Sequence, residues 1–307
     1  MIEPLSHVEA PKSLWARLST ILEMIKFSHT IFALPFALLA AAIASHREGG
    51  WRVLDLVAIL LCMVLARSAA MAFNRWADQR FDRENPRTAT RAIPAGLLSS
   101  RDVLKFVVLC SLGFVAATTI FIASSGNIWP LVLSVPVLLF LLAYSYMKRF
   151  TSLAHVWLGT ALALSPVAAW IAIRGTIEWP PVLLGVAIAC WVTGFDIIYA
   201  CQDIDVDRQQ GLHSIPSKLG FQGAMNVARV VHVVMVVALV GFGVLTPELG
   251  IFFWIGLGIV AILLAVEHWL VRGRDLLKIN LAFLQVNGTI STLLLLVTLA
   301  DLYLPAV

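Results

Sequence analysis

Nine stretches of mostly apolar residues divide this chain of 307 residues, and polar loops separate them. A helix needs about 20 apolar residues to cross the hydrocarbon of a bilayer, where it satisfies its own backbone hydrogen bonds. We therefore predict an all-α polytopic membrane protein, one domain over residues 1–307, in which nine transmembrane helices form a bundle around a central cavity. The predicted spans are 27–45, 53–73, 103–123, 129–147, 153–173, 179–201, 223–246, 250–271 and 281–304.

The composition excludes other classes of protein. Only 13% of the residues are charged, whereas roughly a quarter are charged in soluble domains. The net charge of +4 reflects basic loops between apolar stretches, so we do not expect a nucleic-acid partner. The first twenty residues have no continuous apolar segment typical of a cleaved signal. The cysteines lie inside apolar stretches without metal-binding spacing, and we expect them to be packing residues: Cys62, Cys110, Cys190 and Cys201.

Lys and Arg are concentrated in alternate loops. Most of the 22 basic residues lie in the N-terminal segment or follow the second, fourth, sixth and eighth spans. Cytoplasmic loops carry such an excess, so we predict a cytoplasmic N-terminus and an external C-terminus. We therefore expect an integral, multi-pass protein whose lipid partner is the bilayer of the bacterial cytoplasmic (inner) membrane. Residues 14–26 are amphipathic, and we expect them to lie in the membrane interface.

An acidic cluster lies at the cytoplasmic end of the second span. Asn74, Asp78 and Asp82 are spaced four residues apart. At 3.6 residues per turn they share one face of a helix, so an amide and two carboxylates converge. This spacing alone is also typical of a solvated helix end.

A second acidic cluster closes the sixth span. Asp196 lies within the span, and Asp203 and Asp207 follow it. Asp203 and Asp207 match Asp78 and Asp82 at one constant offset along the chain, which suggests two related halves. Paired carboxylates repel one another unless a cation lies between them. Mg²⁺ prefers oxygen ligands and is often shared between carboxylates and substrate phosphates, so two such clusters favour a magnesium-bound diphosphate.

Basic residues follow both clusters. They are Arg80, Arg83, Arg87 and Arg91 in the first loop, and Arg208, His213 and Lys218 in the second. Arg guanidinium groups bind diphosphate oxygens well, whereas the alternative is cytoplasmic anchoring of the loops. Of these residues, we expect Arg87 and Arg91 to bind the diphosphate.

Several polar residues lie inside or at the ends of the spans. Arg67 lies two turns inside the second span, where an unpaired charge is costly. We expect it to meet an anionic or phenolic substrate group, and the alternative is an ion pair with Asp196 or Glu267. Tyr144 and Lys148 lie four residues apart at the end of the fourth span. They are expected either to contact phosphate or to anchor the cytoplasmic end of the span. Asn287 in the ninth span is typical of an interhelical hydrogen bond.

Three segments resemble one known family. ARSAAMAFNRWADQRFDRENPRTATRAIPAG (66–96), YSYMKRFT (144–151) and YACQDIDVDRQQGLHSIP (199–216) are similar to the signatures of the UbiA superfamily of intramembrane aromatic prenyltransferases. The resemblance covers nearly the whole chain and implies a nine-helix fold. Together the three segments are specific for this superfamily, whereas a single pair of aspartates four residues apart (DxxxD) is not.

The resemblance also implies an activity. Within the superfamily, the chain is most similar to 4-hydroxybenzoate polyprenyltransferases, which attach a polyprenyl tail to a quinone-precursor ring. It implies a polyprenyl diphosphate and a small aromatic acid as substrates, Mg²⁺ as cofactor, and ubiquinone biosynthesis as the setting. Residues implied to bind Mg²⁺ and diphosphate are Asn74, Asp78, Asp82, Asp203 and Asp207, with Tyr144, Lys148 and Tyr199 implied beside the substrate.

The chain departs from the family at one loop. Gly211, Leu212, His213 and Ser214 stand where many such enzymes have GxKS. This form resembles a branch that acts on 1,4-dihydroxy-6-naphthoate for menaquinone, so the aromatic acceptor has two candidates. In either case the aromatic ring attacks an allylic cation, and Asp196 is our candidate for the base that removes the ring proton.

Two other functions remain open from the sequence. A transporter also places charges inside a bundle of helices, but it usually holds them near the midplane of the membrane. Phosphoalcohol transfer to lipid also uses membrane-embedded Asp clusters with Mg²⁺. It usually has a DGxxAR spacing, which neither cluster contains.

Overall fold

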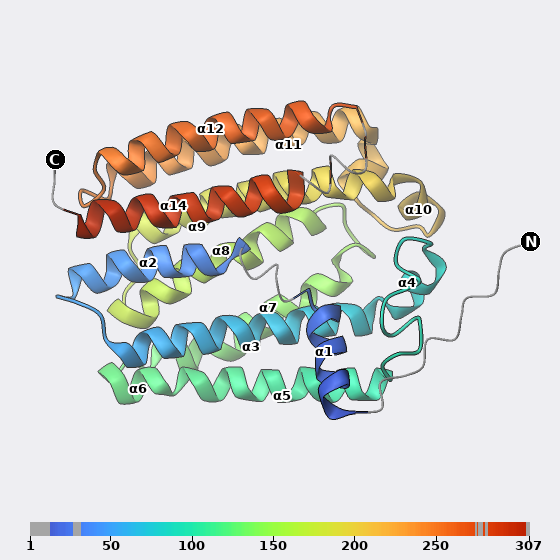
Figure 1. The fold of residues 1–307 in the computed structure, drawn as a ribbon, viewed down its shortest axis with the longest axis horizontal. Helices are drawn as coiled ribbons and strands as arrows, with labels where there is room; N and C mark the ends of the chain where they lie inside the picture. Colours follow the sequence, from blue (N-terminus) through green and yellow to red (C-terminus); the bar gives the residue numbers. More distant parts are fainter. Residues whose placement is uncertain (1–12, 27–31, 274, 276–278, 280–281, 305–307) are drawn as a thin grey trace, which may run out of the picture.

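A computed structural model describes residues 13–26, 32–273, 275, 279 and 282–304, and its long elements are helices that run side by side (Figure 1). The prediction of an all-α membrane protein is confirmed. The helices at the nine predicted positions are α2 (Leu34–Arg47), α3 (Val53–Ala77), α5 (Ser100–Thr118) with α6 (Ile120–Ser125), α7 (Trp129–Met147), α8 (Ala154–Arg174), α9 (Trp179–Ala200), α11 (Ile215–Val244), α12 (Ile251–Val271) and α14 (Asn287–Tyr303).

Eight helical segments within the described residues are long and apolar enough to cross a membrane. The ninth position is held by α2, whose 14 residues make a shorter apolar helix. The predicted span 27–45 begins in residues 27–31, which lie outside the described residues. The predicted count of nine therefore corresponds to eight long spans and one shorter helix.

Local sequence explains where several boundaries differ from the prediction. Helix α11 begins at Ile215 rather than at residue 223, because Ser214 and Ser217 form a capping box around Pro216. Gly220 interrupts this helix with φ 69°, a value that glycine adopts without steric cost. A π-helical segment (Ala282–Val286) precedes α14 and takes up the start of the last predicted span.

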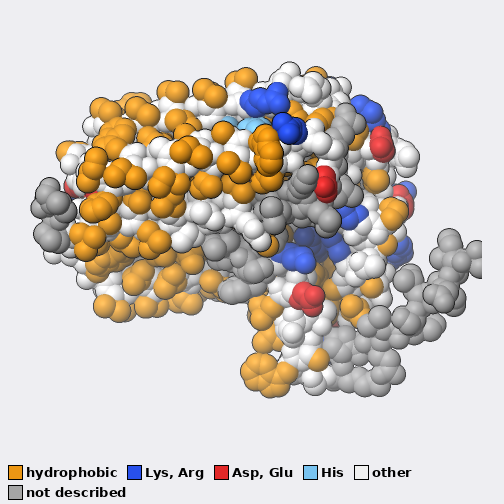
Figure 2. Space-filling view, turned by 45° about the horizontal axis from the view of Figure 1, so that its top comes forward, with side chains coloured by type: hydrophobic (Ala, Val, Ile, Leu, Met, Phe, Trp, Pro, Cys, Tyr) orange, Lys and Arg blue, Asp and Glu red, His pale blue; other side chains and the backbone are white. Residues whose placement is uncertain are grey.

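Helix α9 lies in the core and packs against α8 and α11, while α3 packs against α5. Trp191 of α9 is fully buried, and its ring contacts Phe36 and Phe195. Many apolar side chains on the outer helices are exposed. In Figure 2 they cover one part of the surface, whereas charged side chains gather towards the other. This distribution is that of a bundle surrounded by lipid.

A polar network joins four helices inside the bundle. Asn287 accepts a hydrogen bond from Trp191 Nε1 (2.7 Å) and donates one to Glu267 Oε1 (2.8 Å). The prediction of an interhelical hydrogen bond for Asn287 is therefore confirmed. Nearby, His232 Nδ1 and His268 Nε2 lie 3.0 Å apart and link α11 to α12.

Helix α1 (Leu14–Met24) runs across α3 (Figure 1), and the side chain of its N-cap, Ser13, accepts a hydrogen bond from Ala16 N. The predicted amphipathic segment is thus helical. Trp15, Leu18 and Leu22 are exposed on it. Its position in a membrane interface stays a prediction.

The loops that carry the acidic clusters lie at one end of the bundle. They contain α4 (Gln79–Glu84), a 3-10 turn (Cys201–Asp203) and α10 (Ile204–Gln209), and α4 and α10 face each other in Figure 1. At the opposite end, Arg47 forms ion pairs with Glu178 (3.0 Å) and Glu248 (2.6 Å). The two ends of the bundle are thus held by different sets of charges.

Candidate functional site

Helices α3 and α9 end in the same way. Asp78 lies between α3 and α4 with φ −93° and ψ 5°, and Asp203 precedes α10 with φ −108° and ψ 12°. Each aspartate therefore turns the chain from a long helix into a short one. This shared geometry agrees with the constant offset between the two clusters.

The bend corrects one detail of the prediction, since Asn74, Asp78 and Asp82 do not lie on one continuous helix. The backbone hydrogen bonds Asp78 N to Asn74 O (2.9 Å) and Asp82 N to Asp78 O (2.8 Å) continue through the bend. All three side chains therefore still face one cavity.

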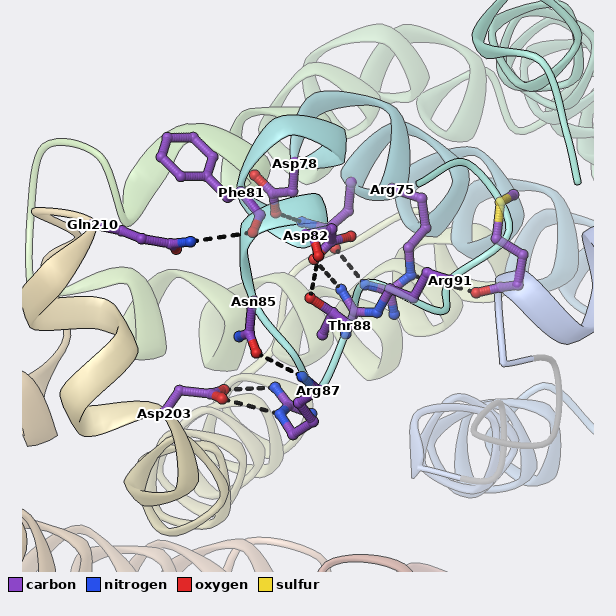
Figure 3. Close-up of polar contacts among 12 residues, drawn as sticks. Arg75, Asp78, Phe81, Asp82, Asn85, Arg87, Thr88, Arg91, Asp203 and Gln210 are labelled. Carbon is purple, nitrogen blue, oxygen red and sulfur yellow. Dashed lines mark hydrogen bonds and ion pairs between the residues drawn. The ribbon is translucent and has the colours of Figure 1, made fainter. Parts of the chain in front are cut away.

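This cavity has a volume of about 640 Å³ and reaches both acidic clusters. Among its lining residues are Arg67, Asn74, Asp78, Asp82, Arg87, Arg91, Tyr144, Lys148, Asp196, Tyr199, Asp203 and Asp207. The fold thus brings the predicted site residues to one cavity, although they come from the two clusters, the loop after α3 and the end of α7. The two segments that carry the clusters also touch, because Gln210 Nε2 donates to Phe81 O at 3.2 Å (Figure 3).

The first cluster is held by two arginines. Arg91 Nη1 donates to Asp82 Oδ1 at 2.6 Å, and Arg149 Nη2 donates to Asp78 Oδ1 at 3.2 Å. Asn74 Nδ2 donates to the other oxygen of Asp78 at 2.9 Å. Burial raises the pKa of the Asp78 carboxyl, and the hydrogen bond from Arg149 opposes that shift.

The second cluster is joined to the first loop by Arg87. Its Nε and Nη2 atoms donate to Asp203 Oδ1 (2.9 Å) and Oδ2 (2.6 Å), as Figure 3 shows. Its Nη1 donates to Tyr199 Oη at 3.3 Å. Burial lowers the pKa of the Arg87 guanidinium, but the bonds to Asp203 outweigh this and raise it overall. Before any ligand binds, Arg87 and Arg91 thus neutralise carboxylates.

Two carboxylate oxygens in the cavity are available for a cation. Asp82 Oδ2 and Asp207 Oδ2 are buried, and neither accepts a hydrogen bond from the described part of the chain. A buried oxygen without a partner is costly, and a hard divalent cation satisfies it. No three His, Cys, Asp or Glu side chains of the described residues are close enough to hold a metal alone. The donor set therefore fits Mg²⁺ that takes further oxygens from a substrate.

Arg67 has no carboxylate partner among the described residues. Its Nη2 donates to Lys26 O at 3.5 Å, and its Nε is buried without a partner. Among the described residues Arg67 forms neither of the alternative ion pairs: Asp196 bonds to His155, and Glu267 bonds to Asn287. Arg67 instead lines the cavity, where its free donor can meet an anionic group.

The other basic residues of the two loops do not line the cavity. Arg80 is 85% exposed and pairs with Glu84, and Arg208 donates to Ser217 O. Arg83, His213 and Lys218 are exposed. For these five residues the alternative of loop anchoring is the better interpretation.

Three residues at the site were missed by the sequence analysis. Arg75 lines the cavity beside Asn74, Arg149 holds Asp78, and His155 holds Asp196. Arg149 follows Lys148 directly, so its position at the end of a span was a usable signal. Nothing in the local sequence links His155 to Asp196, because they belong to different helices.

The chain is similar to proteins of one family. Residues 33–293 match the UbiA prenyltransferase family. A 4-hydroxybenzoate octaprenyltransferase of Pseudomonas fluorescens is 32% identical over 241 residues, which cover 78% of each chain.

Solved structures have the same fold. The apo structure of a UbiA homologue from Aeropyrum pernix has a TM-score of 0.75 at 29% identity, covering 89% of this chain and 96% of that one. A UbiA homologue from Archaeoglobus fulgidus bound to GPP and Mg²⁺ has a TM-score of 0.70 at 16% identity, covering 92% and 99%. These matches name prenyltransferase relatives rather than transporters. The chain belongs to the UbiA prenyltransferase family.

Proposed function

We propose that this membrane prenyltransferase moves a polyprenyl chain from its diphosphate to 4-hydroxybenzoate in ubiquinone biosynthesis. The observation that carries the proposal is the single cavity onto which both acidic clusters and their basic partners open. Relatives about one third identical bear the name 4-hydroxybenzoate octaprenyltransferase, which supports this acceptor.

The proposed Mg²⁺ ligands are Asn74, Asp78, Asp82, Asp203 and Asp207. The unpartnered oxygens of Asp82 and Asp207 support this assignment. When bound, Mg²⁺ supplies positive charge that stabilises the departing diphosphate. UbiA homologues bound to Mg²⁺ with DMAPP or GPP have the same fold.

Basic side chains bind the rest of the diphosphate in this proposal. Arg91 uses Nη1 on Asp82, and a guanidinium has five donors, so others remain for phosphate oxygens. Lys148 and Tyr144 line the same cavity, and Arg87 with Tyr199 borders it on the α9 side. Their charges and hydroxyl groups stabilise the leaving group as its bond to the allylic carbon breaks.

Arg67 is the proposed contact for the carboxylate of the aromatic acid. It lies on α3 above Asn74, and its Nε has no partner in the described residues. An arginine bonded to that carboxylate orients the ring beside the allylic carbon. The ring carbon ortho to the hydroxyl then forms the new bond, and Asp196 takes the proton from that carbon.

Apolar side chains complete the cavity. Phe32, Leu158, Leu162, Val192 and Phe195 line it away from the charged loops. These side chains exclude water from an allylic cation, which water would otherwise trap. Exposed apolar surface on the surrounding helices suits a polyprenyl tail that enters from the lipid.

A second acceptor, 1,4-dihydroxy-6-naphthoate, is supported by the loop that departs from the family pattern. Leu212 of this loop lines the cavity, and His213 N donates to Lys148 O at 2.7 Å. The loop therefore contacts the Tyr144 and Lys148 element and borders the substrates. The chemistry is the same for both acceptors.

We also propose a setting for the enzyme. The protein lies in the inner membrane of a bacterium. Its acidic clusters and its N-terminus are on the cytoplasmic side, as the distribution of basic residues predicts. The whole chain, residues 1–307, acts as one catalytic domain. Its partners are then two small substrates and the bilayer, without a nucleic acid.

The test uses the purified protein in detergent. A polyprenyl diphosphate is supplied with 4-hydroxybenzoate or with dihydroxynaphthoate, with Mg²⁺ or with EDTA. We expect Mg²⁺-dependent release of diphosphate and a prenylated 4-hydroxybenzoate. If only the dihydroxynaphthoate were prenylated, it would be the acceptor instead of 4-hydroxybenzoate. Full turnover in EDTA would contradict the assignment of Mg²⁺.

A further inference from the structure

His155 of α8 forms a short hydrogen bond with Asp196 of α9, the proposed proton acceptor. Its Nδ1 lies 2.6 Å from Asp196 Oδ2, although the two residues are 41 positions apart. The side chain of His155 is fully buried, whereas that of Asp196 is 16% exposed and lines the cavity. His155 therefore acts on the cavity only through Asp196.

Close packing of α8 on α9 makes this bond possible. One turn after His155, a side chain at Gly159 would collide with Ala189 O and Thr193 Oγ1. Thr193 Oγ1 donates to Ala189 O at 2.6 Å and to His155 O at 3.3 Å. The glycine thus permits the approach, and the threonine fixes the backbone that carries the imidazole.

The second ring nitrogen identifies the tautomer. Ile215 N lies 3.4 Å from His155 Nε2 and can only donate, so Nε2 carries a lone pair. The proton of the neutral ring is then on Nδ1, and it is donated to Asp196 Oδ2. This bond occupies one carboxylate oxygen and leaves the other for the cavity, which Asp196 lines.

From this geometry we infer that His155 is a positioning residue that holds Asp196 in the orientation of a proton acceptor. The inference rests on the proposed function. After the ring attacks the allylic carbon, the bond between that ring carbon and its proton breaks, and the electron pair restores aromaticity. The proton passes to the free oxygen of Asp196. His155 keeps its Nδ1 proton, because its Nε2 is occupied by the backbone of α11.

Steady-state kinetics of two variants test the inference. In His155→Ala the donor is lost, and we expect kcat to fall about 10-fold or more while KM for the polyprenyl diphosphate stays unchanged. In His155→Asn the amide nitrogen lies near the position of Nδ1, and we expect most of kcat to return. Equal kcat in the wild type and His155→Ala would overturn the inference, as would no recovery in a folded His155→Asn.

A double mutant separates a role through Asp196 from a general structural role. If His155 acts only through Asp196, His155→Ala lowers kcat no further in an Asp196→Asn background. A further loss of the same size as in the wild type would contradict this. If the wild type prenylates no aromatic acceptor, the proposed function fails and the inference fails with it. An active wild type with an unaffected His155→Ala rejects the inference alone.

Nitrogen NMR of histidine-labelled protein gives a readout that does not depend on activity. We expect one of the seven histidines to be protonated on Nδ1 and unprotonated on Nε2. Its signals should be those lost in His155→Asn. Protonation of that histidine on Nε2 instead would show that the proposed bond to Asp196 does not form.

Discussion

Arg87 and Asp203 lie 116 positions apart and form an ion pair with two hydrogen bonds, which joins the loop after α3 to the end of α9. The pair connects the loop that follows the first acidic cluster to Asp203 of the second, and both residues line the cavity. Because the guanidinium already neutralises one carboxylate, the site is pre-arranged before a diphosphate and metal bind. Its two partners come from the two halves of the chain that the matched spacing suggested.

Replacement of Asp203 by Asn removes a proposed metal ligand and leaves Arg87 without its partner. We expect turnover to fall by about 100-fold or more, because less charge on the departing diphosphate is stabilised. Asp205→Asn is the matched control, since Asp205 is exposed in the same loop and does not line the cavity. Diphosphate release measures both. Similar activity in the two variants would speak against Asp203 as a ligand.

Replacement of Arg67 by Gln removes the cation proposed to bind the acidic aromatic. We expect KM for that acid to rise about 10-fold, the size of one lost hydrogen bond to a charged group, with a smaller change for the prenyl donor. The control is Arg80→Gln, because Arg80 is exposed and pairs with Glu84. An equal rise in KM for both substrates would show that Arg67 does not distinguish them.

The ion pair between Arg47 and Glu248 predicts a pH dependence of stability. Burial alone would raise the pKa of Glu248, but the hydrogen bond from Arg47 outweighs it and lowers the pKa below its ordinary value of 4.5. The stabilisation is therefore present above pH 4.5 and is lost as the pH falls through the lowered pKa.

Thermal unfolding in detergent measures this effect. Glu248→Gln should be less stable than the wild type at neutral pH by about 1–2 kcal/mol, because a charge-assisted bond is lost. Well below pH 4.5, the wild-type carboxyl is also neutral, and we expect the two proteins to converge. A constant difference at every pH would refute the role of the Glu248 charge.

Asn287→Leu should destabilise the bundle by about 1–3 kcal/mol, because Trp191 Nε1 and Glu267 Oε1 lose their partner in a buried site. Thr289→Ala is the control, since Thr289 is exposed on the same helix and bonds only locally to Gln285 O. Unfolding temperatures in detergent compare the two. Equal temperatures for both variants would mean that the network contributes nothing to stability.

The sequence by itself determined the spans and the acidic clusters, because hydrophobic length and residue spacing are local properties. Tertiary structure decided the contacts between distant residues. Arg149 reaches Asp78, His155 reaches Asp196, and Arg67 has no carboxylate partner in the described residues. These pairings depend on how closely helices approach and on the angle at which each ends, and no spacing within a single helix reports either.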